Sequence, residues 1–314
     1  MDVRNVAVAG TGQMGPGIAA VFALAGCGAV IVGRRGETAA QGVASALASI
    51  ETLRVNGLVG AREAGAAAAR IRPSTDLEAA VKSAQLFVES IPEKLDMKQE
   101  FFERLDRASP DAVLCSNTSG ISITQIAARC RRPERVVTTH FWNPPHLMPL
   151  VEVVMGQRTD LAIAEGVVAL LRRSGKVPVL VRKDLPGQLG NRIQHAMVRE
   201  CMHIVAEGIA TAEDVDLAIK AGVGLRTPVY GLFEHHDIVG LDTVKLIQDY
   251  VLPHLSTVQG AAKIHNEKVA RGELGAKTGK GFLDWPPGKA EKVKARRDAF
   301  IMEFLKLQKA GRFD

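Results

Sequence analysis

The feature that most constrains this chain lies near its N-terminus, where a short apolar run meets a glycine-rich turn and then a helical pattern. Residues 6–9 form the run, and glycines follow at positions 10, 12 and 15 with the spacing G-x-G-x-x-G. In such a strand–turn–helix unit the glycines allow a tight turn, the approach of a pyrophosphate and close packing of the helix on the strand. The helix also offers unpaired N–H groups to phosphates. The pattern therefore predicts a dinucleotide site at Gly10, Gly12, Gln13, Met14 and Gly15.

Strand and helix patterns alternate from the N-terminus to residue 181. Short runs rich in β-branched residues predict strands at Asn5–Ala9, Ala29–Val32, Leu86–Ser90, Ala112–Ser116, Arg135–Phe141, Val151–Val154 and Val177–Val181. Segments with helical spacing lie between many of them, at Met14–Ala25, Glu37–Asn56, Lys94–Arg107 and Leu161–Ser174. This alternation predicts a parallel sheet with helices on its faces, which is a Rossmann-type doubly wound α/β domain.

The pattern changes after a turn-like segment at residues 183–187, beyond which strand signals nearly vanish. Residues Thr211 and Asp214 resemble a capping box that opens a helix. Helices are expected at Gly190–Glu207, Thr211–Lys220, Thr243–Leu252, Ala261–Ala270 and Ala290–Lys309. We therefore expect a dinucleotide-binding domain over residues 1–184 and an all-helical domain over residues 185–314.

The composition argues against several classes of protein. Hydrophobic residues make up 46% and charged residues 24% of the chain, a balance typical of soluble globular enzymes. No apolar run is long enough to span a membrane, and no signal-peptide pattern precedes the first strand. The net charge of +6 comes without a nucleic-acid-binding module. The four cysteines are scattered without a C-x-x-C pair, which indicates reduced thiols, a cytoplasmic location and no structural metal.

The end of the second predicted strand bears on the choice of cofactor. An acid that binds the ribose hydroxyls is expected there, but the chain has Gly33, Arg34 and Arg35. A small residue followed by guanidinium groups suits a 2′-phosphate, which arginine grips in a bidentate manner. We therefore expect NAD(P), with NADP favoured over NAD. In the alternative interpretation the two arginines belong to an exposed loop and Glu37 reaches the ribose.

Polar side chains gather near the ends of three predicted strands. Ser119 follows one strand, His140 closes another, and Glu152 lies within a third. The oxidation of a hydroxyl needs a base for its proton, and histidine titrates in the useful range. A carboxylate on the other ring nitrogen fixes the tautomer and favours the imidazolium that forms. Glu152 can take that part if the two strands are neighbours, and Ser119 can hydrogen-bond the reacting oxygen.

These residues lie in motifs that resemble the 3-hydroxyacyl-CoA dehydrogenase family. The family motifs N-T-S, H-F-F-N-P and L-V-E match the segments that contain Ser119, His140 and Glu152, and the spacings of 21 (140 − 119) and 12 (152 − 140) residues agree with the family pattern. The family's P-G-F-x-x-N-R resembles residues 186–192. Residues 91–98 and 239–242 resemble two further family segments, so that the resemblance extends over most of the chain.

The resemblance implies a role for each matching residue. His140 is the general acid and base held by Glu152, while Ser119 and Asn191 bind the substrate oxygen. Glu93, Lys98 and Asn117 lie near the cofactor, and the helical domain contributes to the substrate cleft and forms a homodimer. The family works without a metal, and we assign the adjacent histidines 235 and 236 a structural or interface role.

Three departures keep the substrate open. No lysine occurs between residues 36 and 81, where fatty-acyl members use lysines to hold CoA phosphates. Residues 143–149 follow an N-P-P form, similar to relatives that oxidise carnitine, gulonate or pyridine-carboxylate compounds. The third departure is the G-R-R segment. We expect a hydride transfer to or from the 3-hydroxy or 3-keto carbon of a short-chain acyl-CoA. The alternatives are a dehydrogenase of a small polar hydroxy acid or aldehyde, and a non-catalytic member of the family.

Overall fold

The computed structural model describes residues 1–312 and divides them into two compact units. The first unit contains residues 1–192 together with Ile301–Lys306, and the second contains residues 193–300 and 307–312. The segment before Arg192 is bound to the first unit, because Asp184 accepts hydrogen bonds from the Ser122 hydroxyl at 2.5 Å and from the Thr124 N–H at 2.8 Å.

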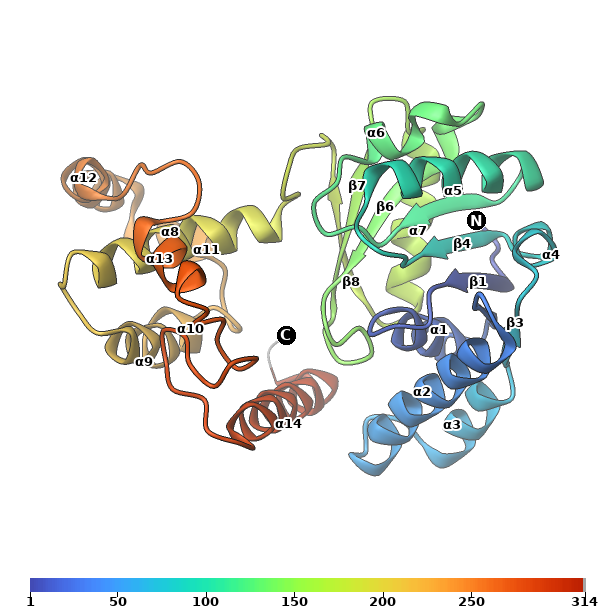
Figure 1. Ribbon diagram of the computed structural model, residues 1–314, viewed down its shortest axis with the longest axis horizontal. Coiled ribbons are helices and arrows are strands. Elements are labelled where there is room, and N and C mark those ends of the chain that lie inside the picture. Colours follow the sequence, from blue (N-terminus) through green and yellow to red (C-terminus); the bar gives the residue numbers. More distant parts are fainter. Residues whose placement is uncertain (313–314) are drawn as a thin grey trace. The chain divides into compact units, whose positions relative to one another are not determined.

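The first unit is built on one eight-stranded sheet with the strand order β3-β2-β1-β4-β5-β6-β7-β8 (Figure 1). The strands are β1 (Asn5–Ala9), β2 (Gly28–Val32), β3 (Ile71–Ser74), β4 (Leu86–Glu89), β5 (Val113–Ser116), β6 (Val136–Phe141), β7 (Leu150–Met155) and β8 (Val177–Val181). All neighbouring pairs are parallel except β6 and β7. The predicted doubly wound sheet is therefore confirmed.

Helices cover both faces of this sheet. One apolar cluster joins it to α1 (Gly15–Leu24), α2 (Gly36–Val55), α3 (Ala61–Ala68) and α7 (Leu161–Arg173). The other cluster joins the opposite face to α4 (Leu77–Ser83), α5 (Leu95–Ala108) and α6 (Ile123–Ile126). Side chains in β1 alternate between the two clusters, because successive residues of a strand point to opposite faces. The inner strands of the sheet are thus buried on both sides, which explains their nearly continuous apolar sequences.

Two features of the sheet differ from the sequence-based expectation. The β6–β7 pair is antiparallel, since the eight residues 142–149 between them are too few for a crossover helix. Strand β3 was missed, because Pro73 interrupts a short polar run. It forms an edge of the sheet, where a residue without an N–H is tolerated.

The second unit is helical, as predicted. Its helices are α8 (Gly190–Ala206), which starts in the first unit, α9 (Ala212–Ala221), α10 (Val223–Arg226), α11 (Leu232–Val239), α12 (Leu241–Val251), α13 (Lys263–Ala270) and α14 (Lys289–Lys309). The Thr211 hydroxyl caps α9 by accepting a hydrogen bond from the Asp214 N–H at 3.1 Å. Among the described residues from 193 onward, Gly281 alone is buried.

None of the helices in residues 1–312 is long and apolar enough to cross a membrane.

Candidate active site

The glycine-rich turn between β1 and α1 has the shape that a dinucleotide needs. Gly10 has a φ of +120°, which L side chains rarely adopt, and a Cβ there would overlap the carbonyl oxygen of Ser90. A Cβ on Gly15 would overlap the carbonyl oxygen of Gly10, so the helix starts directly against the turn. Above Gly12 no heavy atom lies within 4 Å of the place where a Cβ would be. The turn therefore leaves open space in front of the α1 N-terminus, as pyrophosphate binding requires.

The three residues after β2, expected to meet the ribose end of the cofactor, differ in exposure. Arg34 and Arg35 are both exposed, and Arg35 precedes the first turn of α2. Gly33 is buried, and a Cβ there would lie 2.7 Å from the backbone nitrogen of Ala39. Close packing of the turn on α2 thus explains this glycine without any phosphate. The two arginines remain the groups that can meet a 2′-phosphate.

His140 and Glu152 are direct partners across the antiparallel β6–β7 pair. The His140 Nδ1 lies 2.7 Å from Oε2 of Glu152, and both side chains are almost fully buried. Directly opposite residues of an antiparallel pair point to the same face, so the strand register itself creates this contact. With Nδ1 engaged, Nε2 is the ring nitrogen that can meet a substrate.

Glu152 accepts four hydrogen bonds, two at each carboxylate oxygen. The backbone N–H groups of Leu189 and Gly190 each donate to Oε1 at 2.8 Å. Oε2 accepts from the Trp142 indole at 3.0 Å as well as from His140. Burial raises the pKa of Glu152, but the hydrogen bonds from His140, Gly190, Trp142 and Leu189 outweigh it and lower the pKa to about 2. The carboxylate is therefore a fixed negative charge beside the imidazole.

The loop after β5 is held through two successive carbonyl groups. The Gln188 side-chain amide donates to the Thr118 carbonyl at 2.9 Å, and the Asn191 amide donates to the Ser119 carbonyl at 2.9 Å. Ser119 itself is exposed, which leaves its hydroxyl open to a ligand. Asn191 thus lies beside Ser119, the residue with which the sequence argument paired it.

Gln188 is the most unusual residue of this site. It adopts a φ of +52° and is 5% exposed. A carbonyl oxygen can only accept, so the amide nitrogen of Gln188 must face Thr118 and its Oε1 must point away. Within residues 1–312 this oxygen has no hydrogen-bond partner. A strained backbone and an unpaired buried oxygen both cost stability, and such features concentrate at functional sites.

Comparisons with known proteins identify the family to which a chain with this site belongs. Residues 5–185 match the 3-hydroxyacyl-CoA dehydrogenase NAD binding domain, and residues 187–285 match the C-terminal domain of the same family. The chain belongs to the 3-hydroxyacyl-CoA dehydrogenase family. It is an oxidoreductase that uses a nicotinamide dinucleotide.

Relatives of this dehydrogenase differ in substrate. The 5-formyl-3-hydroxy-2-methylpyridine 4-carboxylate 5-dehydrogenase of Mesorhizobium japonicum is 33% identical over 94% of this chain and 95% of its own length. A probable 3-hydroxybutyryl-CoA dehydrogenase of Bacillus subtilis is 36% identical over 91% of this chain and 98% of its own. A crystal structure of a pyridine-carboxylate 5-dehydrogenase, described as an NAD+-dependent dismutase, superposes with a TM-score of 0.88 at 30% identity, covering 96% of this chain and 97% of its own.

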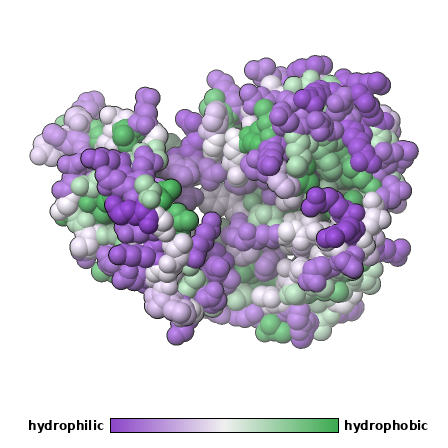
Figure 2. Space-filling model, in the orientation of Figure 1, coloured by the Kyte–Doolittle hydropathy of each residue, from purple (hydrophilic) through white to green (hydrophobic). Residues whose placement is uncertain are grey.

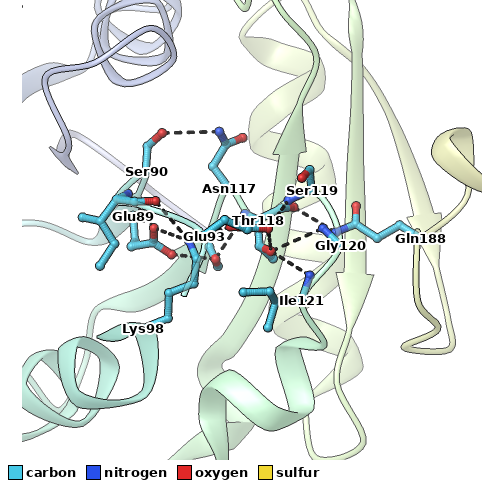
Figure 3. A network of polar contacts seen from close by, with 12 residues as sticks. Glu89, Ser90, Glu93, Lys98, Asn117, Thr118, Ser119, Gly120, Ile121 and Gln188 are labelled. Carbon is cyan, nitrogen blue, oxygen red and sulfur yellow. Dashed lines mark hydrogen bonds and ion pairs between the residues drawn. The ribbon is translucent and has the colours of Figure 1, made fainter. Parts of the chain in front are cut away.

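An ionic network around a buried lysine supports the Ser119 loop of the dehydrogenase (Figure 3). Lys98 is 1% exposed and lies 2.6 Å from Glu89 and 3.2 Å from Glu93. Glu93 in turn accepts hydrogen bonds from the Thr118 hydroxyl and, at 3.0 Å, from the Ser119 N–H. Burial raises the pKa of Glu93, but the Thr118 hydrogen bond and the Lys98 ammonium outweigh it, so the pKa lies below its ordinary value.

The network changes how Lys98 is understood. Its ammonium is enclosed and contacts the carboxylates of Glu89 and Glu93, and a place for Lys98 beside the cofactor stays a prediction. Asn117, also expected near the cofactor, joins the ends of two strands by accepting from the Phe141 N–H at 2.8 Å. Its amide also donates to the Ser90 hydroxyl at 3.4 Å, beside the glycine turn. Both residues therefore position backbone that borders the cofactor turn and the Ser119 loop.

Sequence reasoning did not single out Trp142, Gln188 or Glu89 as site residues. The signal for the first two was present, because the family motifs have phenylalanine at both positions. Glu89 lies at the end of a buried apolar strand and carries no motif, so only its contacts reveal it. Among the described residues no group of three metal-ligating side chains comes together, and this holds for the neighbourhood of His235 and His236 as well.

Proposed function

We propose that this dehydrogenase transfers a hydride between a nicotinamide dinucleotide and the hydroxyl-bearing carbon of a small polar hydroxy acid or aldehyde. The observation that carries this choice is Gln188. Where the family motif has a phenylalanine, this chain has a buried amide directly behind the Ser119 loop. An aromatic side chain at this place suits an apolar acyl chain, whereas the amide places a polar group behind the loop and favours a polar substrate. The similarity to the pyridine-carboxylate dehydrogenases supports the same choice.

The proton is handled by the protein. Nε2 of His140 would accept it from the substrate hydroxyl. A nicotinamide dinucleotide held at the turn of Gly10, Gly12 and Gly15 would supply the hydride acceptor. The Glu152 carboxylate, 2.7 Å from Nδ1, stabilises the imidazolium that results. The exposed Ser119 hydroxyl and the Asn191 amide hydrogen-bond the oxygen as it becomes a carbonyl. In the reverse direction the same groups deliver the proton.

A short-chain 3-hydroxyacyl-CoA is the second candidate. It is favoured by a shallow apolar hollow between α2 and α3, the helical excursion where fatty-acyl members hold CoA, and by the relatedness to a probable 3-hydroxybutyryl-CoA dehydrogenase. Leu47, Ile50 and Ala64 line the hollow, and Arg54 borders it. That arginine is paired with Glu51 at 2.5 Å, which lowers the attraction for a phosphate.

Parallel assays distinguish the two candidates. Absorbance of the reduced nicotinamide is followed with acetoacetyl-CoA on one side, and with carnitine, gulonate and hydroxymethyl- or formyl-pyridine carboxylates on the other. We expect saturable turnover with a member of the second set and none with the thioester. Saturable turnover with acetoacetyl-CoA alone would reverse the order. The variant His140→Ala serves as the blank for both sides.

We also propose that NADP is preferred over NAD, because both exposed arginines after β2 can approach a 2′-phosphate. The double variant Arg34→Ala, Arg35→Ala should weaken NADPH binding about tenfold or more and leave NADH binding nearly unchanged. Tighter binding of NADH than of NADPH by the unaltered protein would contradict the preference.

We also propose that the protein is a homodimer and that it is located in the cytoplasm. The four cysteines are free, as is usual in a reducing compartment. Large apolar side chains on the helices of the second unit are exposed, for example Phe233 at 85% and Tyr250 at 76%. Figure 2 shows hydrophobic residues, in green, among hydrophilic ones on the surface of this unit. Exposed apolar surface on this scale marks a contact surface, and a second copy of the chain is the partner we infer for it.

A further inference from the structure

The indole of Trp142 shares a carboxylate oxygen with the histidine of the site. Its Nε1 donates to Oε2 of Glu152 at 3.0 Å, and the same oxygen lies 2.7 Å from Nδ1 of His140. The family motif H-F-F-N-P has phenylalanine at this position, and phenylalanine has no donor. A phenylalanine at this position could not make this hydrogen bond.

The surrounding backbone is shaped for this indole. A Cβ on Gly190 would lie 2.5 Å from Cζ2 of the Trp142 ring, so only glycine allows the ring to rest there. The N–H of Gly190 meanwhile binds the other oxygen of Glu152 at 2.8 Å. The indole also lies close to the imidazole, with the two ring centroids 5.9 Å apart. Trp142 is half-buried and lies against both Gly190 and His140.

We propose that Trp142 is a positioning residue for the catalytic base. Its indole N–H competes with Nδ1 of His140 for the same carboxylate oxygen of Glu152, and so weakens the hydrogen bond between Glu152 and the imidazole. A carboxylate oxygen with a second N–H donor attracts the Nδ1 proton less strongly, because each donor stabilises the anion at the expense of the other. Loss of the indole donor should therefore strengthen the hold of Glu152 on that proton. The effect on catalysis rests on the proposed function, in which His140 is the base. The hydrogen bond itself can be tested without any turnover.

Few other charges face the imidazole. Glu152 is the ionised group that contacts it from β7, and the start of α8 contributes the N–H groups of Leu189 and Gly190. The Lys176 ammonium, beside β8, is bound to the carbonyls of Pro145 and Met148 at 2.6 and 2.9 Å. His146 lies in the same 142–149 loop. Within the described residues Glu152 is thus the carboxylate through which the indole can act on His140.

The first test uses the fluorescence of a single tryptophan. The chain has two, so the variant Trp285→Phe leaves Trp142 as the only emitter. Imidazolium quenches indole emission more strongly than neutral imidazole does. We expect emission to rise with a single titration as the pH increases, and the rise to disappear in Trp285→Phe, His140→Ala. The indole N–H resonance of Trp142 should lie downfield of that of Trp285 and move with the same titration. An indole signal that does not respond to pH would overturn the contact.

The second test compares pH profiles of kcat/KM for alcohol oxidation. In Trp142→Phe, which restores the family residue, the acid limb should move to higher pH by about half a unit or more, with the plateau reduced less than tenfold. Gly190→Ala, which displaces the ring, should move the limb in the same direction, and Trp285→Phe should not move it. An unmoved limb in both variants would overturn the tuning role. Absence of turnover in the unaltered protein, with the fluorescence titration intact, would instead refute the proposed function.

Discussion

The two units of this dehydrogenase differ in how they bury their apolar residues. The first has two buried clusters, one on each face of its sheet, with β-strand residues such as Val8, Phe87 and Leu114 fully enclosed. In the second, helices α9 to α13 contain no buried residue, and Leu246 on α12 is 71% exposed. The first unit therefore has the burial needed to hold its own fold, whereas the helices of the second leave large apolar side chains uncovered.

The reacting side chains lie in one of the two units. The contacts of His140, Glu152, Ser119 and Asn191 are all made within the first unit. Groups held by a packed sheet keep their geometry on their own, so their variants should act on turnover and on the stability of the first unit. Variants on α11 and α12 should act on assembly and on the stability of the second unit.

The largest expected effect is on turnover. His140→Ala should lower kcat/KM by about 10²- to 10⁴-fold, because the substrate proton loses its acceptor. Dinucleotide affinity, measured by fluorescence titration, should change little, since the glycine turn is a separate contact of the first unit. Turnover within tenfold of the unaltered enzyme would mean that another residue is the base.

The next effect tests the exposed helices. The double variant Leu246→Lys, Tyr250→Lys places two charges on the apolar face of α12 and should convert a dimer, of twice 33.6 kDa, into a monomer. Light scattering after gel filtration measures the mass. Lys245→Ala, on the polar side of the same helix, is the matched control and should stay dimeric. A monomeric unaltered protein would contradict the proposed partner.

A third prediction concerns acid stability of the first unit. The folded-state pKa of Glu152 is lowered to about 2, so the stabilisation by its carboxylate is complete above the ordinary value of 4.5 and is lost as the pH falls toward 2. Glu152→Gln should cost about 3–5 kcal/mol at neutral pH, because an amide donor then faces N–H donors. Urea unfolding at pH 7 and pH 4 should show a smaller acid loss in this variant. An equal loss in both proteins would mean that Glu152 does not titrate as described.

The smallest effect belongs to Lys176. Burial lowers its pKa from 10.5 to about 8, so the unfolded chain binds more protons than the folded one between these values. Stability from this group should therefore rise with pH in that window, with a slope approaching about 1.4 kcal/mol per pH unit. Urea midpoints at pH 7.5 and 9.5 should differ more in the unaltered protein than in Lys176→Met. The reverse order would show that the ammonium stays charged.

Sequence patterns predicted most of the strands because each is a short apolar run bounded by turns, as in β1 and β8. They missed β3 with its Pro73, and they missed α11, whose eight residues include two histidines and no regular polar face. The direction of β7 also lay outside what alternation can show, because it depends on the length of the connection before it.

For the site, the motifs located the reacting groups but not their support. A carboxylate twelve residues after a histidine gives no distance until the strands are known to pair. The enclosure of Lys98 could not be foreseen, because a lysine in an amphipathic helix is ordinarily exposed. The roles of Ser119, Asn191 and the arginines after β2 stay predictions.

The register of β6 and β7 determines whether a folded molecule can be active. His140 faces Glu152 only because the two residues are opposed across the pair. A slip by one residue would turn the whole of β7 over, placing Glu152 among the apolar contacts of α7 and Val151 or Val153 beside the imidazole. Such a molecule would retain its secondary structure and yet be inert. The specific activity of a refolded preparation therefore measures the fraction of chains in which β6 and β7 have paired in the correct register.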